Sequence, residues 1–209
     1  MRPSSQTSRR AASTLAFAAL SLAACPDTSG VFDDFVERSE PFRKGPSAGE
    51  CGGAVDLSGT YLQGVEVAID RTKPLRFRVD VDIDLTTNTI DFAMQALAAP
   101  PNNGDIPAGT PVGEIYTATS PITPADGKFV LAFPSIVVPT AANPILPAPV
   151  TATLTFSGCT STATFSCGTI AGSITDPVTL ALDGSSWALT PLADGVDPMS
   201  ITLVASCPE

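Results

Sequence analysis

The chain of 209 residues contains no histidine, and this absence excludes several kinds of site. A Ser-His-Asp catalytic arrangement, a metal centre with imidazole ligands and histidine acid–base catalysis all need that residue. A glycine-rich phosphate-binding loop is also missing. The 21 acidic residues make some close pair of carboxylates nearly inevitable, so such a pair would be no specific sign of a hydrolase. We therefore predict a protein that is not an enzyme and has no cofactor.

Aromatic residues and long apolar runs are scarce. Sugar-binding surfaces usually present several flat rings, whereas this chain has one tryptophan and two tyrosines, so Trp187 is expected in the core or at its rim. The longest uncharged stretch near the N-terminus, Ala11 to Ala24, has 14 residues, and a membrane-spanning helix needs about 20. Later apolar runs are short and interrupted. No membrane-spanning segment is therefore expected after the N-terminal stretch.

The first 25 residues are arranged as an export signal. Arg2, Arg9 and Arg10 precede the uncharged stretch, which has the length of a signal-peptide core. The stretch ends in Leu22-Ala23-Ala24-Cys25, which resembles the lipobox of bacterial lipoproteins. The resemblance implies cleavage by signal peptidase II before Cys25 and acylation of that cysteine. The alternative is an ordinary secretory signal that leaves Cys25 a free thiol.

The resemblance also implies an address. The best-known signal for retention in the inner membrane is an aspartate directly after the cysteine, and this chain has Pro26 there. We therefore expect an outer-membrane lipoprotein, held by its acyl chains and facing the periplasm or the cell surface. Its parts would be a signal peptide (1–24), an acylated N-terminus with a flexible acidic tether (25–50) and one folded domain (51–209).

The charge of the exported part is strongly negative. All 21 acidic residues follow Cys25, but only 8 of the 11 basic residues do, which leaves a net charge of −13. Phosphate binding needs lysine and arginine gathered on one face, so nucleic acid is not expected as a partner. The simplest role of such acidity is solubility.

Four cysteines remain in the domain: Cys51, Cys159, Cys167 and Cys207. An even number in an exported chain predicts two disulfides, for which three pairings exist. Zinc is disfavoured because no Cys-x-x-Cys pair is present and histidine is absent. We expect the nested pairing of Cys51 with Cys207 and of Cys159 with Cys167, because the first two flank the domain and the other two flank a turn.

Alternating apolar and polar residues predict β-strands through most of the domain. The clearest is 75–85, in which apolar residues alternate strictly with arginines and aspartates, as in a strand with one face in water. Residues 57–69 and 90–96 alternate as well. Residues 100–149 hold 11 of the 20 prolines and should form short edge strands and loops, with candidates at 112–119, 128–133 and 135–138. Further strands are expected at 150–156, 162–175, 178–182, 187–192 and 199–205.

About ten strands with turn signals between them and no helical periodicity predict an all-β fold. The expected architecture is a single antiparallel β-sandwich or flattened barrel.

Asp80, Asp82 and Asp84 are the first candidates for a metal site, because alternation places them on one face of a strand. They would lie about 6.8 Å apart, too far for three carboxylates to share one calcium ion. Arg76 and Arg78 share the same face. We therefore interpret this face as a charged, solvated stripe and expect no metal.

Asp56-Leu57-Ser58-Gly59-Thr60-Tyr61, at the start of the first strand, is similar to the Gly-x-Trp start of lipocalins, with Tyr61 in place of the tryptophan. In that family the aromatic residue plugs the closed end of an eight-stranded barrel around an apolar ligand. The resemblance therefore implies a ligand cavity. The alternative is the glycine-containing first strand of any sandwich.

Two functions are compatible with these features. The first is a non-catalytic envelope or surface protein with a binding or structural role, which would contact protein or polysaccharide. The second is a lipocalin-like carrier of a small apolar ligand. A filled interior would favour the first and a pocket the second.

Overall fold

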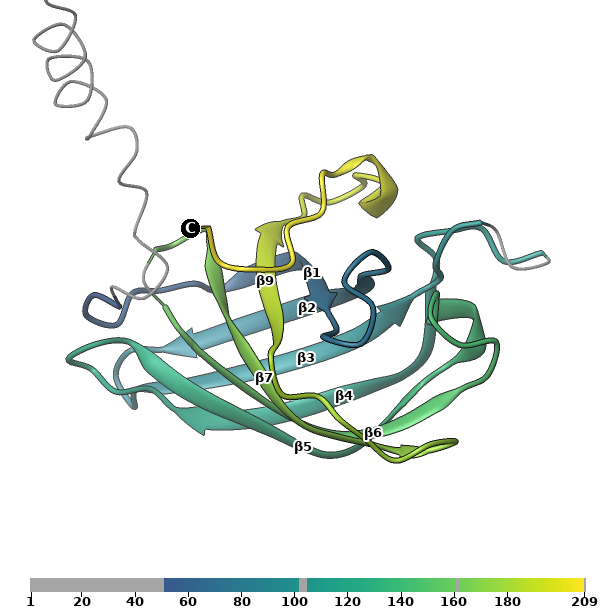
Figure 1. The fold of residues 1–209 in the computed structure, drawn as a ribbon. Helices are drawn as coiled ribbons and strands as arrows, with labels where there is room; N and C mark the ends of the chain where they lie inside the picture. Colours follow the sequence, from purple (N-terminus) through teal and green to yellow (C-terminus); the bar gives the residue numbers. More distant parts are fainter. Residues whose placement is uncertain (1–50, 102–104, 161, 209) are drawn as a thin grey trace, which may run out of the picture. The chain divides into compact units, whose positions relative to one another are not determined.

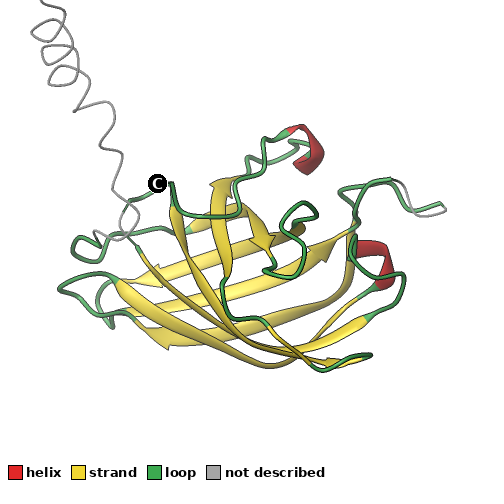
Figure 2. Ribbon diagram, in the orientation of Figure 1, coloured by secondary structure: helices red, strands yellow, loops and turns green. Residues whose placement is uncertain are grey.

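In the computed structural model of the chain, residues 51–101, 105–160 and 162–208 are described. The expectations for the signal peptide, the tether and Cys25 concern residues outside this part. Figure 1 shows the arrangement of the strands and Figure 2 their predominance over two short 3-10 helices. The elements are β1 (Gly59–Glu66), β2 (Leu75–Asp84), β3 (Thr89–Leu97), β4 (Pro111–Pro121), β5 (Lys128–Val138), η1 (Thr140–Ala142), β6 (Val150–Cys159), β7 (Ser166–Asp176), β8 (Leu180–Ala181), β9 (Ser185–Pro191) and η2 (Pro198–Ser200).

The strands form one antiparallel sheet in the order β4-β3-β2-β1-β9-β7-β6-β5, with β8 beside β7. The sheet curves until β4 and β5 come close to each other. There the Tyr116 hydroxyl of β4 accepts a hydrogen bond of 2.8 Å from the backbone N–H of Val137 in β5. The result is a nearly closed, barrel-like sheet, which confirms the expected all-β antiparallel fold.

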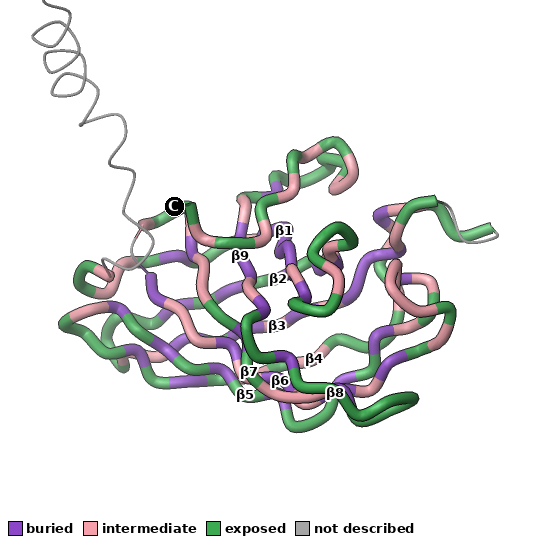
Figure 3. Tube along the Cα trace, in the orientation of Figure 1, coloured by how far each residue is buried: buried purple, intermediate pink, exposed green. Residues whose placement is uncertain are grey.

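Strand β2 shows how the sequence fixes the inner face of the sheet. Val79, Val81 and Ile83 are buried, while Asp80, Asp82 and Asp84 are exposed, as the alternation predicts. A slip of one residue would bury the carboxylates, and an unpaired buried charge costs several kcal/mol. The alternation of buried and exposed residues can be followed along the chain in Figure 3.

The proline-rich stretch forms longer strands than expected. Residues 128–138 make a single strand, β5, in place of the two short ones predicted. Pro134 lies where the pairing with β6 changes register, between Phe133 and Ile136. At such an irregularity the ladder needs no hydrogen bond from this position. The strand can therefore accommodate a proline, which has no backbone N–H to donate.

The prediction of a strand at 199–205 is wrong. This segment begins with η2 and then runs over the outer face of β1, where a Cβ added to Gly64 would collide with the Val204 carbonyl oxygen. The Ser186 hydroxyl also donates to the Ala205 carbonyl. A segment that lies on the face of a sheet cannot join its backbone ladder, despite its alternating residues. The strand expected at 178–182 shrinks to the two residues of β8.

Two disulfides are present, but the expected pairing is wrong. Cys51 pairs with Cys159, and Cys167 pairs with Cys207. Gly158 lies opposite Gly168, so Cys159 and Cys167 follow at the next position along β6 and β7. Side chains directly opposite each other in antiparallel strands have Cβ atoms about 4.5–5.5 Å apart, whereas a disulfide needs about 3.8 Å. Cys159 bonds instead to Cys51, which precedes β1, and Cys167 bonds to Cys207 in the segment that follows η2.

None of the described segments is a helix of the length and apolar character that a membrane span requires.

Candidate functional site

The acidic stripe on β2 lies on the outer face of the sheet. The Thr60 hydroxyl donates to Asp80 over 2.6 Å, and Arg78 makes an ion pair with Asp80 at 3.6 Å. Within the described residues, no three or more acidic or cysteine side chains are placed to hold a metal ion together. Asp84 belongs to the turn that follows β2, because its carboxylate accepts from the backbone N–H of Thr86. This hydrogen bond is the main reason why its pKa lies below the ordinary value.

The strongest candidate site is an apolar pocket with a volume of about 130 Å³. It lies at one end of the sheet, which we call the pocket end. Strands β1, β2, β5, β6, β7, β8 and β9 contribute side chains, and the β1–β2, β5–β6, β7–β8 and β8–β9 connections complete the wall. The lining residues are Val65, Val67, Ile69, Leu75, Phe77, Ile136, Val138, Asn143, Ile145, Leu146, Val150, Ala152, Leu154, Ile170, Ile174, Val178, Leu180, Leu182 and Ser185.

The chemical character of this lining is uniform. Asn143 and Ser185 are its polar members, and none of its residues is charged. Such a surface offers burial of apolar groups and no electrostatic attraction. The pocket can therefore bind a small apolar molecule, whereas a charged group would lose its hydration without gaining a partner.

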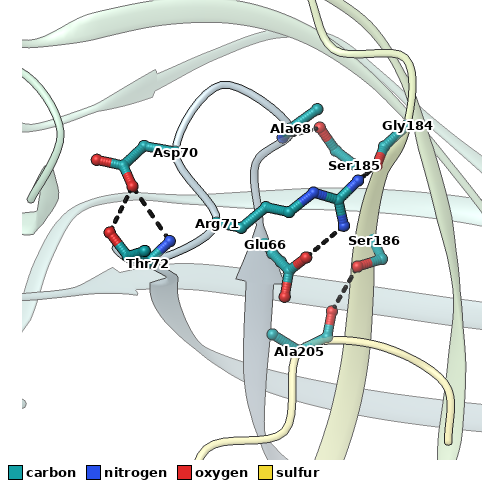
Figure 4. Close-up of polar contacts among 9 residues, drawn as sticks. All are labelled: Glu66, Ala68, Asp70, Arg71, Thr72, Gly184, Ser185, Ser186 and Ala205. Carbon is teal, nitrogen blue, oxygen red and sulfur yellow. Dashed lines mark hydrogen bonds and ion pairs between the residues drawn. The ribbon is translucent and has the colours of Figure 1, made fainter.

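Arg71 ties together two loops at the mouth of the pocket (Figure 4). Its guanidinium group donates to Glu66 over 2.6 Å and to the Gly184 carbonyl over 3.0 Å. Next to it, the Ala68 N–H donates to the Ser185 hydroxyl over 3.0 Å. The loop between β1 and β2 is thereby joined to the turn between β8 and β9, and both segments carry lining residues.

The same loop between β1 and β2 has an internal turn, also seen in Figure 4. Asp70 accepts hydrogen bonds from the Thr72 hydroxyl and the Thr72 N–H. These bonds, led by the one from the hydroxyl, hold the pKa of Asp70 below its ordinary value.

Asn143 organises the third loop of the mouth, which follows β5. Its side-chain oxygen accepts from the N–H groups of Ile145 and Leu146, and its amide nitrogen donates to the Ala148 carbonyl. An asparagine that bonds to backbone groups two and three residues ahead is a common way to stabilise a turn. This turn places two aliphatic side chains against the pocket.

An aromatic cluster lies below the pocket. Leu154 lines the pocket, and Phe156, the next inward residue of β6, belongs to the cluster. The Phe156 ring lies 5.9 Å from that of Trp187 and 5.6 Å from that of Phe133. Gly158 makes room for this packing, since a Cβ there would lie 2.5 Å from the Trp187 ring. The prediction that Trp187 packs in the core is confirmed, because its exposed fraction is 0%.

Tyr61, the residue on which the lipocalin resemblance depends, lies toward the end opposite the pocket. It is buried, and its hydroxyl donates to the Leu57 carbonyl over 3.0 Å. Burial, with a smaller contribution from the negative charge of Asp56, raises its pKa.

Sequence reasoning found many inward-facing strand residues but did not identify the pocket. Alternation shows which face of a strand is inward, but it does not show whether side chains from opposite strands meet. The missed contributors are mainly residues of the loop after β5, such as Ile145 and Leu146. The sequence did contain one sign of the pocket, namely aliphatic residues within proline-rich turns. Turns are usually formed by small and polar residues, so an aliphatic residue there indicates that its side chain packs against something else.

Comparison of the chain with family models, with curated proteins and with solved structures found no match.

Proposed function

We propose that this protein is a lipid-anchored, non-catalytic binding protein of the bacterial outer membrane that carries a small apolar ligand in the pocket. The observation that carries the proposal is the uncharged, almost wholly aliphatic lining of a pocket in the interior of the sheet. A filled core would have favoured a purely structural role. The lipobox resemblance at Cys25 and the export signal before it support the anchor and the address.

The size of the pocket limits the ligand. An engineered apolar cavity of about 150 Å³ in another protein binds benzene, and typical pockets for drug-sized ligands exceed about 300 Å³. A pocket of about 130 Å³ therefore suits a molecule of roughly six to eight non-hydrogen atoms, or one end of a longer chain. Burial of apolar surface is worth about 25 cal/mol per Å² and would supply the affinity.

The binding proposal is tested by native mass spectrometry of the full-length protein purified from its own cells, followed by calorimetric titration with methylcyclohexane. The test variant is Ala152→Leu, which fills the pocket from a buried position on β6. The matched control is Ala171→Leu on β7, where the side chain is exposed. We expect bound mass or methylcyclohexane binding in the wild type and the control, and neither in Ala152→Leu. Equal binding by all three, or none by the wild type, would contradict the proposal.

The anchor is tested separately by labelling cells with a radioactive fatty acid. We expect label on the wild type, and none on Cys25→Ser, which should also leave the membrane fraction. The two acyl signals of a lipoprotein are sufficient for stable anchoring. An unlabelled wild type would refute the anchor and leave the pocket proposal intact.

A further inference from the structure

Two polar groups lie unpaired inside the sheet. Gln63 of β1 is completely buried, and neither its amide nitrogen nor its amide oxygen has a hydrogen-bond partner within the described residues. The indole nitrogen of Trp187 in β9 is likewise buried without a partner among them. An unsatisfied buried donor or acceptor costs about 1–3 kcal/mol, so each such group needs an explanation.

Neither residue lines the pocket, but both are neighbours, within the sheet, of residues that do. Gln63 is the next inward residue of β1 after the pocket-lining Val65, and it pairs with the pocket-lining Phe77 of β2. Trp187 is the next inward residue of β9 after the pocket-lining Ser185. Two neighbouring strands therefore each carry a residue with an unpaired polar group one inward position beyond a residue of the pocket wall.

The two groups are also close to each other. Val65 pairs with Trp187 and Gln63 with Leu189, so Gln63 and Trp187 are diagonal neighbours on one face of the β1–β9 pair. Diagonal neighbours lie about 7–8 Å apart at the backbone, which long and aromatic side chains can span. One small polar group located between them could bond to both.

We propose that the pocket binds a neutral apolar molecule with one hydroxyl or carbonyl group, which is buried against Gln63 and Trp187. This inference rests on the proposed function and names its ligand class. The Trp187 N–H and the Gln63 amide N–H donate to the ligand oxygen, and a hydroxyl can also donate to the Gln63 amide oxygen. A carboxylate is disfavoured because the lining carries no charge to pair with it.

The test compares cyclohexanol with methylcyclohexane, which have the same shape and number of non-hydrogen atoms. Calorimetric titration of the full-length protein measures both affinities in the wild type and in Gln63→Met. The substitution preserves the length and unbranched form of the side chain and removes its hydrogen bonds. We expect Gln63→Met to weaken cyclohexanol binding about tenfold or more and to leave methylcyclohexane binding equal or tighter.

Leu189→Met is the matched control, because Leu189 is the buried neighbour of Gln63 in β9 and is already apolar. It should change both affinities by the same factor. A second measurement uses the wild type alone. Trp187 is the only tryptophan of the chain, so its emission should shift to longer wavelength with cyclohexanol and not with methylcyclohexane.

The outcomes separate the inference from the function on which it rests. If the wild type binds both molecules and Gln63→Met changes both affinities equally, the ligand class is wrong and the pocket function stands. The same holds if the Trp187 emission responds alike to both molecules, as expected if water satisfied the two groups. If the wild type binds neither, both proposals fail.

Discussion

The end of the sheet that carries Cys159 and Cys167 is held by covalent bonds, whereas the pocket end is held by loops and exposed polar contacts. Both disulfides join the first of these ends, which we call the cysteine end, and the described residues show none at the pocket end. In Figure 1 the β4–β5 loop of the cysteine end lies at the left, and the loop after β5, of the pocket end, at the right. Strand β6 connects the two, from Val150 in the pocket wall to Cys159.

The contacts at the pocket end are individually weak. The Arg71–Glu66 ion pair is largely exposed on the arginine side, and such surface pairs contribute about 0–1 kcal/mol. By the chain-entropy estimate, a disulfide that closes a loop of about 100 residues contributes about 4.7 kcal/mol. The difference is compatible with the proposed binding function, for which a closed sheet at one end and weakly held loops at the other would be needed.

The largest expected effect is the loss of a disulfide at the cysteine end. Replacing Cys51 and Cys159 by serine opens a loop with a sequence separation of 108. We expect the free energy of unfolding to fall by about 4–5 kcal/mol, measured by urea denaturation. Replacing Cys167 and Cys207, with a separation of 40, should cost about 4 kcal/mol. A loss below about 1 kcal/mol in both variants would show that the disulfides do not distinguish the two ends.

A matched pair of core substitutions compares the packing of the two ends. Leu131 is completely buried and pairs with Phe156 of the aromatic cluster, whereas Leu154 already faces the pocket. Leucine-to-alanine changes in cores cost about 2–5 kcal/mol, more where the side chain is packed on all sides. We expect Leu131→Ala to cost about 4 and Leu154→Ala about 2 kcal/mol in urea denaturation. Equal costs would mean that the pocket wall is packed as tightly as the cluster.

The strands and their inner faces were largely predictable from the sequence, whereas the disulfide pairing at the cysteine end and the pocket were not. The period-two pattern of 75–85 determines the inner face of β2 because the alternative register would bury carboxylates. The same pattern failed at 199–205, where alternating residues cover the outer face of β1 without pairing. Alternation indicates which side of a segment is buried, but it does not indicate which other segment of the chain covers that side.

The disulfide pairing and the pocket needed the tertiary structure for a related reason. Spacing along the chain favoured Cys159 with Cys167, but the folded chain brings Cys51 to the first and Cys207 to the second. The pocket depends on how far apart inward side chains of non-neighbouring strands lie, which no local pattern encodes. Gln63 lies in phase with the apolar residues of 57–69, but only the folded sheet shows that its side chain has no hydrogen-bond partner within the described residues.

The smallest expected effect concerns acid stability, in which the two ends should behave alike. Asp84 is the last residue of β2, at the cysteine end, and Asp70 lies in a loop of the pocket end. Each has its pKa lowered by hydrogen bonds within its turn. A lowered folded-state pKa adds stability above the unfolded-state value of about 3.9, and this stability is lost as the pH falls through the folded-state pKa.

Asparagine at either position can still accept the turn hydrogen bonds, but it does not titrate. In urea denaturation between pH 7 and pH 2.5, we therefore expect Asp84→Asn and Asp70→Asn each to be slightly less stable than the wild type at neutral pH. The difference should shrink as the pH falls below the unfolded-state pKa of about 3.9 and disappear once the wild-type carboxyl is protonated in the folded chain as well. A difference that stays constant with pH would show that the hydrogen bonds do not depend on the charge. A pH-dependent difference at Asp84 alone would show that the Asp70 turn does not persist in solution, and that the mouth of the pocket is looser than the rest of the sheet.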